Sequence, residues 1–265
     1  MKKYRTIWLS DTHLGTKGTK SHFLLNFLQQ TKSDYLYIVG DFIDGWQLKK
    51  SWNWIAEHNN VIQSVLRKAQ NGTKVVYIPG NHDEFARKFA ELTFGNISIH
   101  HETNHVTADG RNILILHGDE YDVATKYARW IELLGSVAYN GLIAINRILN
   151  EIRRMLDYPY WSLSTYLKHK TKKAQKYFDD FMHAAIEDAK VRGFDGVVCG
   201  HVHYSMLSEL DGITYANTGD WVENCTALVE EYNGDLELIS WTHIKESALE
   251  EYNIYHDMPA LVQQN

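Results

Sequence analysis

The stretch RTIWLSDTHLG, which runs from Arg5 to Gly15, decides the fold class of the chain. Its first part, Arg5–Ser10, is rich in apolar, aromatic and β-branched residues, which is typical of a strand buried in a sheet. Its second part, Asp11-Thr12-His13, is polar and ends the strand. The same order returns twice: Gly40-Asp41 follows the apolar run Tyr35–Val39, and Gly80-Asn81-His82 follows Lys74–Ile78.

The segments between these three strands have helical periodicity. Apolar residues recur at spacings of three and four over Ser21–Thr31 and Ser51–Gln70, which predicts amphipathic helices there. An alternation of strand and helix favours βαβ crossovers and a largely parallel sheet. Because ligand sites in open α/β sheets gather at the carboxyl ends of the strands, we expect the three polar tails to meet in space.

The second half of the chain has a different pattern. Residues 121–190 are mostly helical, with a break at Asp157-Tyr158-Pro159, and strands return from Gly196. We therefore expect one α/β domain over residues 1–265, interrupted by a helical insert at about 121–190. Three dipeptides predict hairpins: Asp109-Gly110, which joins Ile97–Ala108 to Arg111–Leu116, then Asp211-Gly212, and Asn233-Gly234.

The composition excludes several classes of protein. The 265 residues are 44% hydrophobic and 23% charged, with only 3 Pro and 2 Cys, as in a globular protein with a large core. A disordered chain, a collagen-like repeat and a disulfide-rich miniprotein are excluded. The net charge of −6 argues against a broad nucleic-acid surface, so no nucleic-acid partner is expected. The sequence leaves the oligomeric state open.

Positive charge is concentrated in the predicted insert. Residues 121–180 hold ten Lys and Arg against six Asp and Glu. This segment either meets an anion or an anionic surface, or it forms one solvated helix face. The apolar stretch Trp130–Leu149 contains Glu132 and Arg147 and is too polar to span a membrane. No signal segment follows Met1, so we expect a cytoplasmic protein, at most peripheral to the membrane.

Five short motifs carry the side chains of a metal site. They combine carboxylate, imidazole and amide oxygen, a mixture that suits Mn, Fe, Zn or Ni better than a thiophilic metal. Two such ions about 3.5–4 Å apart, sharing one carboxylate, can clamp the attacking and leaving oxygens of a phosphoryl displacement. The candidate ligands are Asp11, His13, Asp41, Asn81, His117, His201 and His203.

The motif set DTH, GD, GNHD, HGD and GHVH resembles the calcineurin-like metallophosphoesterase superfamily over residues 5–240. The resemblance implies a four-layer α/β/β/α sandwich and a dinuclear centre, with Mn²⁺ as the expected metal. By the resemblance, His82 acts on the phosphoryl charge or the leaving oxygen, and Asp41 bridges the two metals. One metal would be held by Asp11, His13, Asp41 and His203, and the other by Asp41, Asn81, His117 and His201.

Within this superfamily, the chain is most similar to the UDP-2,3-diacylglucosamine diphosphatases of lipid A biosynthesis. GDFIDGW, HGDEYD and a helical insert before GHVH carry that similarity. It implies that the insert is a lid that shelters acyl chains, or else simply packs onto the body. An apolar groove for these acyl chains could be formed by seven residues of the insert: Trp130, Ile131, Leu133, Leu134, Leu142, Ile143 and Ile145. The predicted substrate-binding residues are Asp122, Arg153, Arg154, Lys168 and Lys172.

One departure separates the chain from that group, which has Arg where His82 stands and reads GNRD instead of GNHD. Three alternatives therefore stay open. The enzyme could act on another lipid-linked or nucleotide phosphodiester, or on a soluble phosphodiester or phosphomonoester. The third alternative is a metal-binding scaffold without catalysis. The expected partner is a phosphorylated small molecule or a lipid-linked substrate at the inner membrane face. Asp44 and Asp83 are expected either to orient metal ligands or to cap turns.

Overall fold

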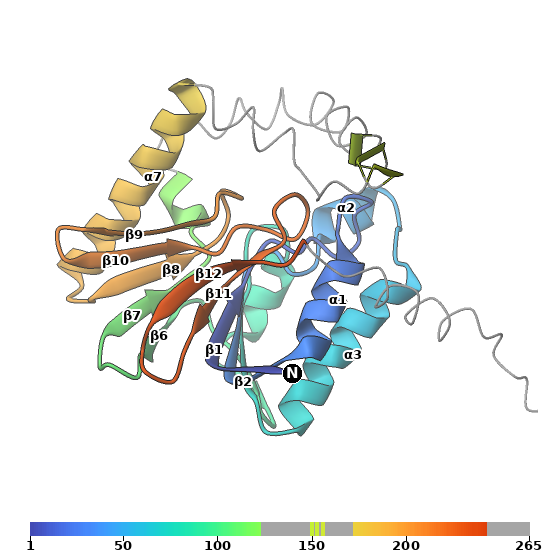
Figure 1. Ribbon diagram of the computed structural model, residues 1–265, viewed down its shortest axis with the longest axis horizontal. Coiled ribbons are helices and arrows are strands. Elements are labelled where there is room, and N and C mark those ends of the chain that lie inside the picture. Colours follow the sequence, from blue (N-terminus) through green and yellow to red (C-terminus); the bar gives the residue numbers. More distant parts are fainter. Residues whose placement is uncertain (123–148, 151, 154, 157–171, 243–265) are drawn as a thin grey trace, which may run out of the picture.

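Two β-sheets packed face to face form the centre of the molecule (Figure 1). The structure is a computed structural model that describes residues 1–122, 149–150, 152–153, 155–156 and 172–242. The first sheet has the strand order β12-β11-β1-β2-β3-β5-β4. Its strands are β1 (Lys2–Leu9), β2 (Thr31–Val39), β3 (Lys74–Ile78), β4 (Thr93–Phe94), β5 (Ile97–Ile99), β11 (Thr226–Glu230) and β12 (Leu236–Ser240).

The first sheet is parallel at its centre and antiparallel at both edges. β1, β2, β3 and β5 are parallel neighbours, whereas β11 and β4 run antiparallel to β1 and β5. The βαβ order predicted from the sequence is therefore confirmed. Thr6 of β1 pairs with Glu230 of β11, so the sheet joins the two ends of the described chain.

The second sheet has the strand order β6-β7-β8-β10-β9. β7, β8 and β10 are parallel neighbours, and the two edge strands are antiparallel to them. The hairpins predicted at Asp109-Gly110, Asp211-Gly212 and Asn233-Gly234 all form. The strands are β6 (Thr103–Val106), β7 (Asn112–Ile115), β8 (Gly196–Cys199), β9 (Met206–Leu210) and β10 (Ile213–Asn217).

Two predicted elements differ in the structure. The continuous strand predicted at Ile97–Ala108 is wrong, because the chain leaves the first sheet after β5 and enters the second sheet at β6. The helix predicted over Ser51–Gln70 begins later, as α3 (Ala56–Gln70). A short helix that was not predicted, α2 (Gly45–Lys50), precedes it. Its first turn is capped by Asp44, whose Oδ1 accepts from the backbone N–H of Gln47 at 2.7 Å.

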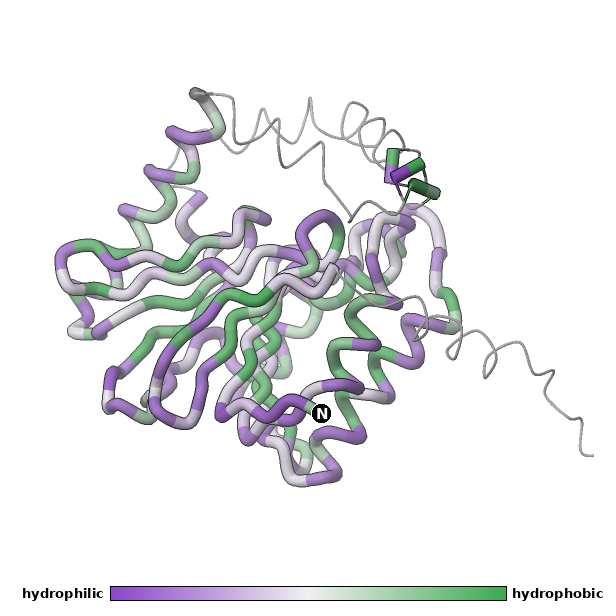
Figure 2. The backbone as a smooth tube through the Cα atoms, in the orientation of Figure 1, coloured by the Kyte–Doolittle hydropathy of each residue, from purple (hydrophilic) through white to green (hydrophobic). Residues whose placement is uncertain are grey.

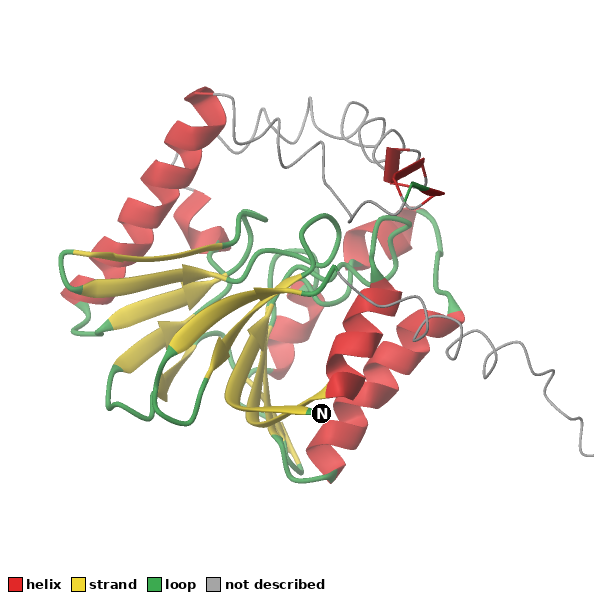
Figure 3. Cartoon of the chain, viewed as in Figure 1, coloured by secondary structure: helices red, strands yellow, loops and turns green. Residues whose placement is uncertain are grey.

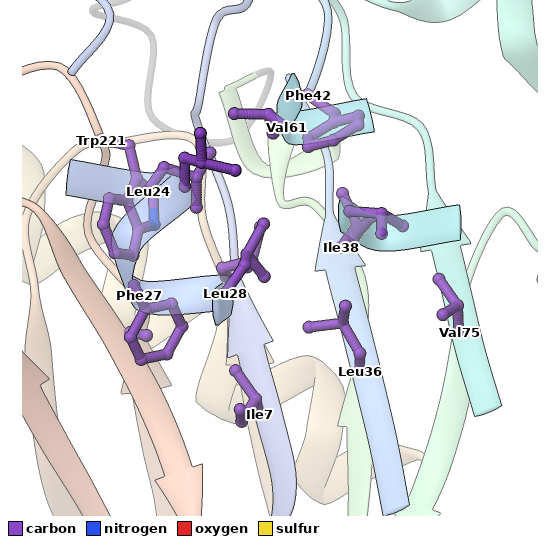
Figure 4. Packing of buried hydrophobic residues seen from close by; sticks show 14 of the residues in the cluster. Ile7, Leu24, Phe27, Leu28, Leu36, Ile38, Phe42, Val61, Val75 and Trp221 are labelled. Atoms are coloured by element: carbon purple, nitrogen blue, oxygen red, sulfur yellow. The ribbon is translucent and has the colours of Figure 1, made fainter. Parts of the chain in front are cut away.

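Helices cover the outer faces of both sheets (Figure 3). α1 (Ser21–Gln30) and α3 pack on the first sheet. Figure 4 shows Leu24, Phe27 and Leu28 of α1 gathered over Ile7 of β1 and Leu36 of β2. Two short 3₁₀ turns come after strands: η1 (Glu84–Phe89) after β3, and η2 (Asp119–Tyr121) after β7.

The second sheet is covered by α7 (Lys172–Val191), through the buried residues Phe181, Ala185 and Ala189. Between the sheets, Trp8 and Tyr37 meet side chains of the second sheet such as Ile115 and Val198 in a third apolar cluster. In Figure 2 hydrophobic stretches lie on the strands at the centre of the molecule, whereas hydrophilic stretches are frequent on the outer strands and hairpins. Helix, sheet, sheet and helix therefore stack in the four layers that the resemblance implied.

Much of the predicted insert lies outside the described residues, including Trp130, Leu134, Ile143 and the rest of the predicted apolar groove. Only its last helix, α7, is seen at length, and that helix packs on the second sheet as part of the outer layer. The lid therefore stays a prediction. Among the helices that the structure describes, none combines the length and apolarity that a membrane span requires.

Candidate metal centre

The polar tails of the strands converge at one edge of the sandwich, beyond the carboxyl ends of β1, β2, β7 and β8. Their backbone is unusual, because several ligand candidates are non-glycine residues in the left-handed region. The φ angles are 51° at Asp11, 47° at His13, 50° at Asp41, 70° at His201 and 52° at His203. Such conformations are unfavourable for L-residues and cluster where function fixes a side-chain direction.

Asp11, His13 and His203 form the first group of side chains. The Nε2 atom of His203 lies 3.2 Å from Oδ1 of Asp11 and 3.1 Å from Nε2 of His13. Asp11 and His13 are buried. The other oxygen of Asp11, Oδ2, accepts from Ser10 Oγ and from the backbone N–H of His201 at 2.9 Å. These contacts point Oδ1 at the two imidazoles.

Asp41, His117, His201 and Asn81 form the second group. Nε2 of His117 lies 3.5 Å from Oδ2 of Asp41 and 3.3 Å from Oδ1 of Asn81. One nitrogen or oxygen from each of Asp41, His117 and His201 falls within 4.8 Å of the others. On its other side, His117 Nδ1 lies 2.9 Å from the carbonyl oxygen of Val39. A carbonyl only accepts, so Nδ1 carries a proton, and Nε2 is the ring nitrogen that faces the group.

Asp41 lies between the two groups. Its Oδ2 is 3.5 Å from His117 Nε2 and 3.7 Å from His13 Nε2. Its Oδ1 accepts from the backbone N–H of His82 at 2.8 Å. Two glycines make room for this arrangement. A Cβ on Gly80 would lie 2.3 Å from Oδ1 of Asp41, and one on Gly40 would lie 2.0 Å from Nδ1 of His117.

Asp44 joins the first group to His82. Its Oδ2 accepts from Nδ1 of His13 at 3.1 Å, and its Oδ1 lies 3.1 Å from Nδ1 of His82. The same carboxylate caps α2, so both expectations for Asp44 are met at once. The ring of His82 lies against that of Trp46, with centroids 4.3 Å apart and the planes tilted by 34°. A quarter of its side chain (25%) is exposed, whereas that of Asp41 is 3% exposed, so His82 lies at the rim.

Asp83 holds the loop that carries Asp41. It is fully buried and accepts from the backbone N–H groups of Phe42 at 2.8 Å and Gly80 at 2.6 Å, and from the hydroxyl of Tyr77 at 2.5 Å. Burial and the neighbouring Asp41 raise the pKa of Asp83. This residue ties the end of β2 to the end of β3 and contacts no imidazole of the two groups directly.

The charge balance of the site favours a bound cation. Burial raises the pKa of Asp41, but the surrounding histidines outweigh it and hold the pKa well below its usual range. Burial likewise lowers the pKa of His117, yet Asp41 holds it well above the ordinary value. Such shifts mean that positive charge is stabilised here. In the described part of the chain, no lysine or arginine forms a salt bridge with Asp11 or Asp41.

A second observation also supports the binding of divalent metal ions by these residues. Oδ1 of Asp11 is buried and, within the described residues, meets the geometry of no hydrogen bond, although Nε2 of His203 lies 3.2 Å away. A buried carboxylate oxygen without a partner is costly unless a cation compensates it. Nitrogen and oxygen ligands in two groups that share Asp41 match borderline-to-hard divalent metals.

The predicted substrate-binding residues are described only in part. Asp122 lies next to the second group, because its Oδ2 is 2.8 Å from Nε2 of His201 and its Oδ1 accepts from the hydroxyl of Tyr177 at 3.0 Å. It therefore contacts a ligand candidate. Arg153 belongs to the short described segment between 149 and 156, and its contact with substrate stays a prediction. Arg154, Lys168 and the side chain of Lys172 lie outside the described residues.

Two supporting residues were not predicted from the sequence. Trp46 is part of GDFIDGW, but nothing in that motif says that its ring lies against His82. Ser10 precedes Asp11 directly and bonds Oδ2 of Asp11 and the hydroxyl of Thr218, the latter at 2.6 Å. Small hydroxyl residues are common at strand ends, so the position of Ser10 before Asp11 is too weak a signal to predict its contacts.

The comparison with known families agrees with this geometry. The family model for calcineurin-like phosphoesterases matches residues 4–205, which include all seven candidate ligands. The chain belongs to the calcineurin-like phosphoesterase family. A member of this family with clustered His and Asp groups at its strand ends is a metal-dependent phosphoesterase, so the enzyme class predicted from the motifs is confirmed.

Two curated relatives illustrate what the chain is similar to. A UDP-2,3-diacylglucosamine hydrolase from Psychromonas ingrahamii is 26% identical over 83% of this chain and 91% of its own length. One from Neisseria meningitidis serogroup B is 25% identical over 86% of this chain and 94% of its own. A solved hypothetical protein from Pyrococcus horikoshii has a TM-score of 0.46 at 9% identity, covering 97% of this chain and 95% of that one.

Proposed function

We propose that this phosphoesterase uses two divalent metal ions, expected to be Mn²⁺, to hydrolyse the pyrophosphate of UDP-2,3-diacylglucosamine or of a similar lipid-linked sugar nucleotide. The observation that carries the substrate class is the agreement in name among relatives that align over nearly their whole length. The two groups of side chains around Asp41 support the dinuclear chemistry.

The distances support an assignment of residues to each metal. Asp11, His13 and His203 would hold one ion, and His117, His201 and Asn81 the other, with Asp41 shared between them. Bound divalent ions would lower the pKa of water and stabilise charge on the phosphoryl oxygens. The contribution of the chain is to orient the ligand atoms: Asp44 and the Val39 carbonyl accept from the Nδ1 atoms of His13 and His117, so Nε2 of each ring would face the metals.

His82 would act on the substrate from the rim. Asp44 engages its Nδ1, which leaves Nε2 to face a phosphoryl oxygen or the leaving group. Trp46 limits the rotation of the ring because its own ring lies against it. Such a group can donate a hydrogen bond or a proton to the leaving oxygen, which contributes roughly 10²–10⁴-fold to rate. His82 stands where the diphosphatases have Arg, and it can also give up the proton it donates.

The test compares substrates under Mn²⁺: UDP-2,3-diacylglucosamine, its deacylated analogue and bis-p-nitrophenyl phosphate. We expect a clear preference for the acylated sugar nucleotide, because each buried CH₂ contributes about 0.8 kcal/mol. A protein that hydrolyses acylated and deacylated substrates equally well would refute the lipid-linked proposal. The chain would then be a phosphodiesterase or phosphatase for a soluble substrate. A protein that binds metal but hydrolyses none of the three would favour the scaffold alternative.

The predicted lid can be tested separately. Leu134→Gln and Ile143→Gln, two changes in the predicted groove, should raise KM for the acylated substrate and leave hydrolysis of bis-p-nitrophenyl phosphate unchanged, since only uniform binding is lost. Val191→Gln is the matched control, because Val191 is 76% exposed at the end of α7 and should affect neither substrate. Equal loss on both substrates in the groove variants would contradict the lid.

A further inference from the structure

A groove lies at the end of the first sheet opposite the metal centre, where β1, β2 and β3 begin. This groove has a volume of about 1210 Å³ and is bounded by the ends of α1 and α3 and by the first residues of the three strands. Along β2 the lining ends at Tyr35, and the six residues from there to Asp41, at about 3.3 Å each, put roughly 20 Å between the groove and the metal centre. It is therefore distinct from the catalytic site.

The lining of the groove is strongly cationic on a chain whose net charge is −6. The lining contains one acidic residue, Asp34, whose carboxylate accepts a hydrogen bond from the hydroxyl of Tyr232 at 3.2 Å. Such a concentration of one sign in a hollow focuses an attractive field for anions. The cationic lining residues are Lys3, Arg5, Lys32, Arg67, Lys68 and Lys74. Arg5 is also paired with Glu230, at 2.6 Å, so the other five carry most of the field.

The carboxyl ends of α1 and α3 do not explain why so many cations line the groove. The carboxyl ends of helices carry a partial negative charge that nearby cations offset, and Lys68 Nζ does donate to the Thr31 carbonyl at 2.6 Å. Lys3 and Lys32, however, come from strands, where they are direct partners in the β1–β2 register. Like charges opposite each other destabilise a sheet. Neither has a salt bridge among the residues that the structure describes.

Two further features favour the binding of an anion in the groove. Ser33 lines it, is 8% exposed, and its Oγ has no hydrogen-bond partner within the described residues. Rotation about one bond is enough to turn that hydroxyl to a new acceptor. In addition, burial and the neighbouring Lys32 lower the pKa of Lys68 to about 8. An anion in the groove would relieve the repulsion behind that shift.

We propose that this groove, which we call the amino-end groove, binds a soluble anion that carries two or more phosphate groups. Even without Arg5, five cations against one carboxylate exceed what a single phosphate can neutralise. A membrane surface fits less well, because Met1 and Tyr232 are the only exposed large hydrophobic side chains that the described lining offers for insertion among lipids. The proposal does not depend on the identity of the catalytic substrate.

The test measures binding of inorganic tripolyphosphate by isothermal titration calorimetry, with the native chain and with the double variant Lys32→Glu, Lys74→Glu. Both residues are exposed, so the fold should be retained, and circular dichroism checks this. We expect saturable binding that weakens with salt and falls roughly tenfold or more in the double variant. Lys190→Glu is the control, since it makes the same type of charge change at an exposed lysine on α7.

Inhibition of bis-p-nitrophenyl phosphate hydrolysis distinguishes tripolyphosphate binding at the metal centre from tripolyphosphate binding in the groove. The inhibition constant of tripolyphosphate should be unchanged in the double variant, because the groove is remote from the metals. Equal weakening in Lys190→Glu would show a general charge effect and overturn the proposal, as would unchanged binding in the double variant. Sedimentation with phosphatidylglycerol vesicles is the last arm. Vesicle binding that needs Lys32 and Lys74, without tripolyphosphate binding, would also overturn it.

Discussion

Gly80→Ala should damage the metal centre without changing any ligand. The new Cβ would lie 2.3 Å from Oδ1 of Asp41 and 2.6 Å from Cδ2 of His117, whereas ordinary contacts begin near 3.4 Å. The carboxylate would therefore have to retreat by about 1 Å, from the difference between those distances. Metal–ligand distances tolerate only about 0.2 Å. Because Asp41 is shared between the two groups, both proposed ions should be affected.

The expected size of the effect comes from that displacement. A misplacement of about 1 Å at a reacting centre costs on the order of 10²-fold in rate, which is about 2.7 kcal/mol of transition-state stabilisation. Removing a partner of a metal ligand typically lowers metal affinity by about 10–100-fold. Gly80→Ala should therefore lose both bound metal, measured by metal analysis after dialysis, and kcat/KM on bis-p-nitrophenyl phosphate.

Gly212→Ala is the matched control for this prediction. Gly212 has a φ of 76° but nothing within 4 Å of the position of its new Cβ. Alanine there strains the backbone and lowers the melting temperature, yet metal content and kcat/KM should stay at the native level. Native metal content and activity in Gly80→Ala, with the fold intact, would refute the role of Asp41 as the shared ligand.

Three other predictions concern the metal centre and the buried carboxylate of Glu230. His82→Ala should keep both metals by metal analysis while kcat falls roughly 10²–10⁴-fold, and parallel loss of metal would make it a ligand instead. Asp41→Ala should reduce the stoichiometry at both sites, and a variant that still holds two tightly bound ions would contradict the bridge. The pH dependence of stability involves Glu230: burial alone would raise its pKa, but hydrogen bonds from His105, Thr6 and others hold it at about 2 in place of 4.5. Because the folded-state pKa is the lower one, the stabilisation is complete above about pH 4.5 and lost as pH falls toward 2; up to about 3 kcal/mol is at stake. Urea unfolding between pH 6 and 3 should show that loss in the native chain and a flatter profile in Glu230→Gln.

The strand-end motifs could be predicted because each combines two local signals, an apolar run and a polar tail. Parallel pairing then brings Asp11 and Asp41 to one edge, whatever the details of the helices. Other features depend on contacts between distant segments. The sequence predicts that Asp44 either orients a metal ligand or caps a turn, and only the structure shows that one of its oxygens contacts His13 while the other caps α2. The path of residues 97–108 between two sheets has no local signature, because both halves are β-forming.

The pairing of β1 with β11 has a consequence for how the chain folds during synthesis. Thr6 and its partner Glu230 leave the ribosome 224 residues apart. At about 5–20 residues per second, β1 waits on the order of 10–45 s with one edge unpaired. Its sequence, rich in Ile, Trp and Leu, is then open to pairing with other chains. Yield in a cell should therefore depend on the chaperones that bind nascent chains, even for variants whose finished fold is fully stable.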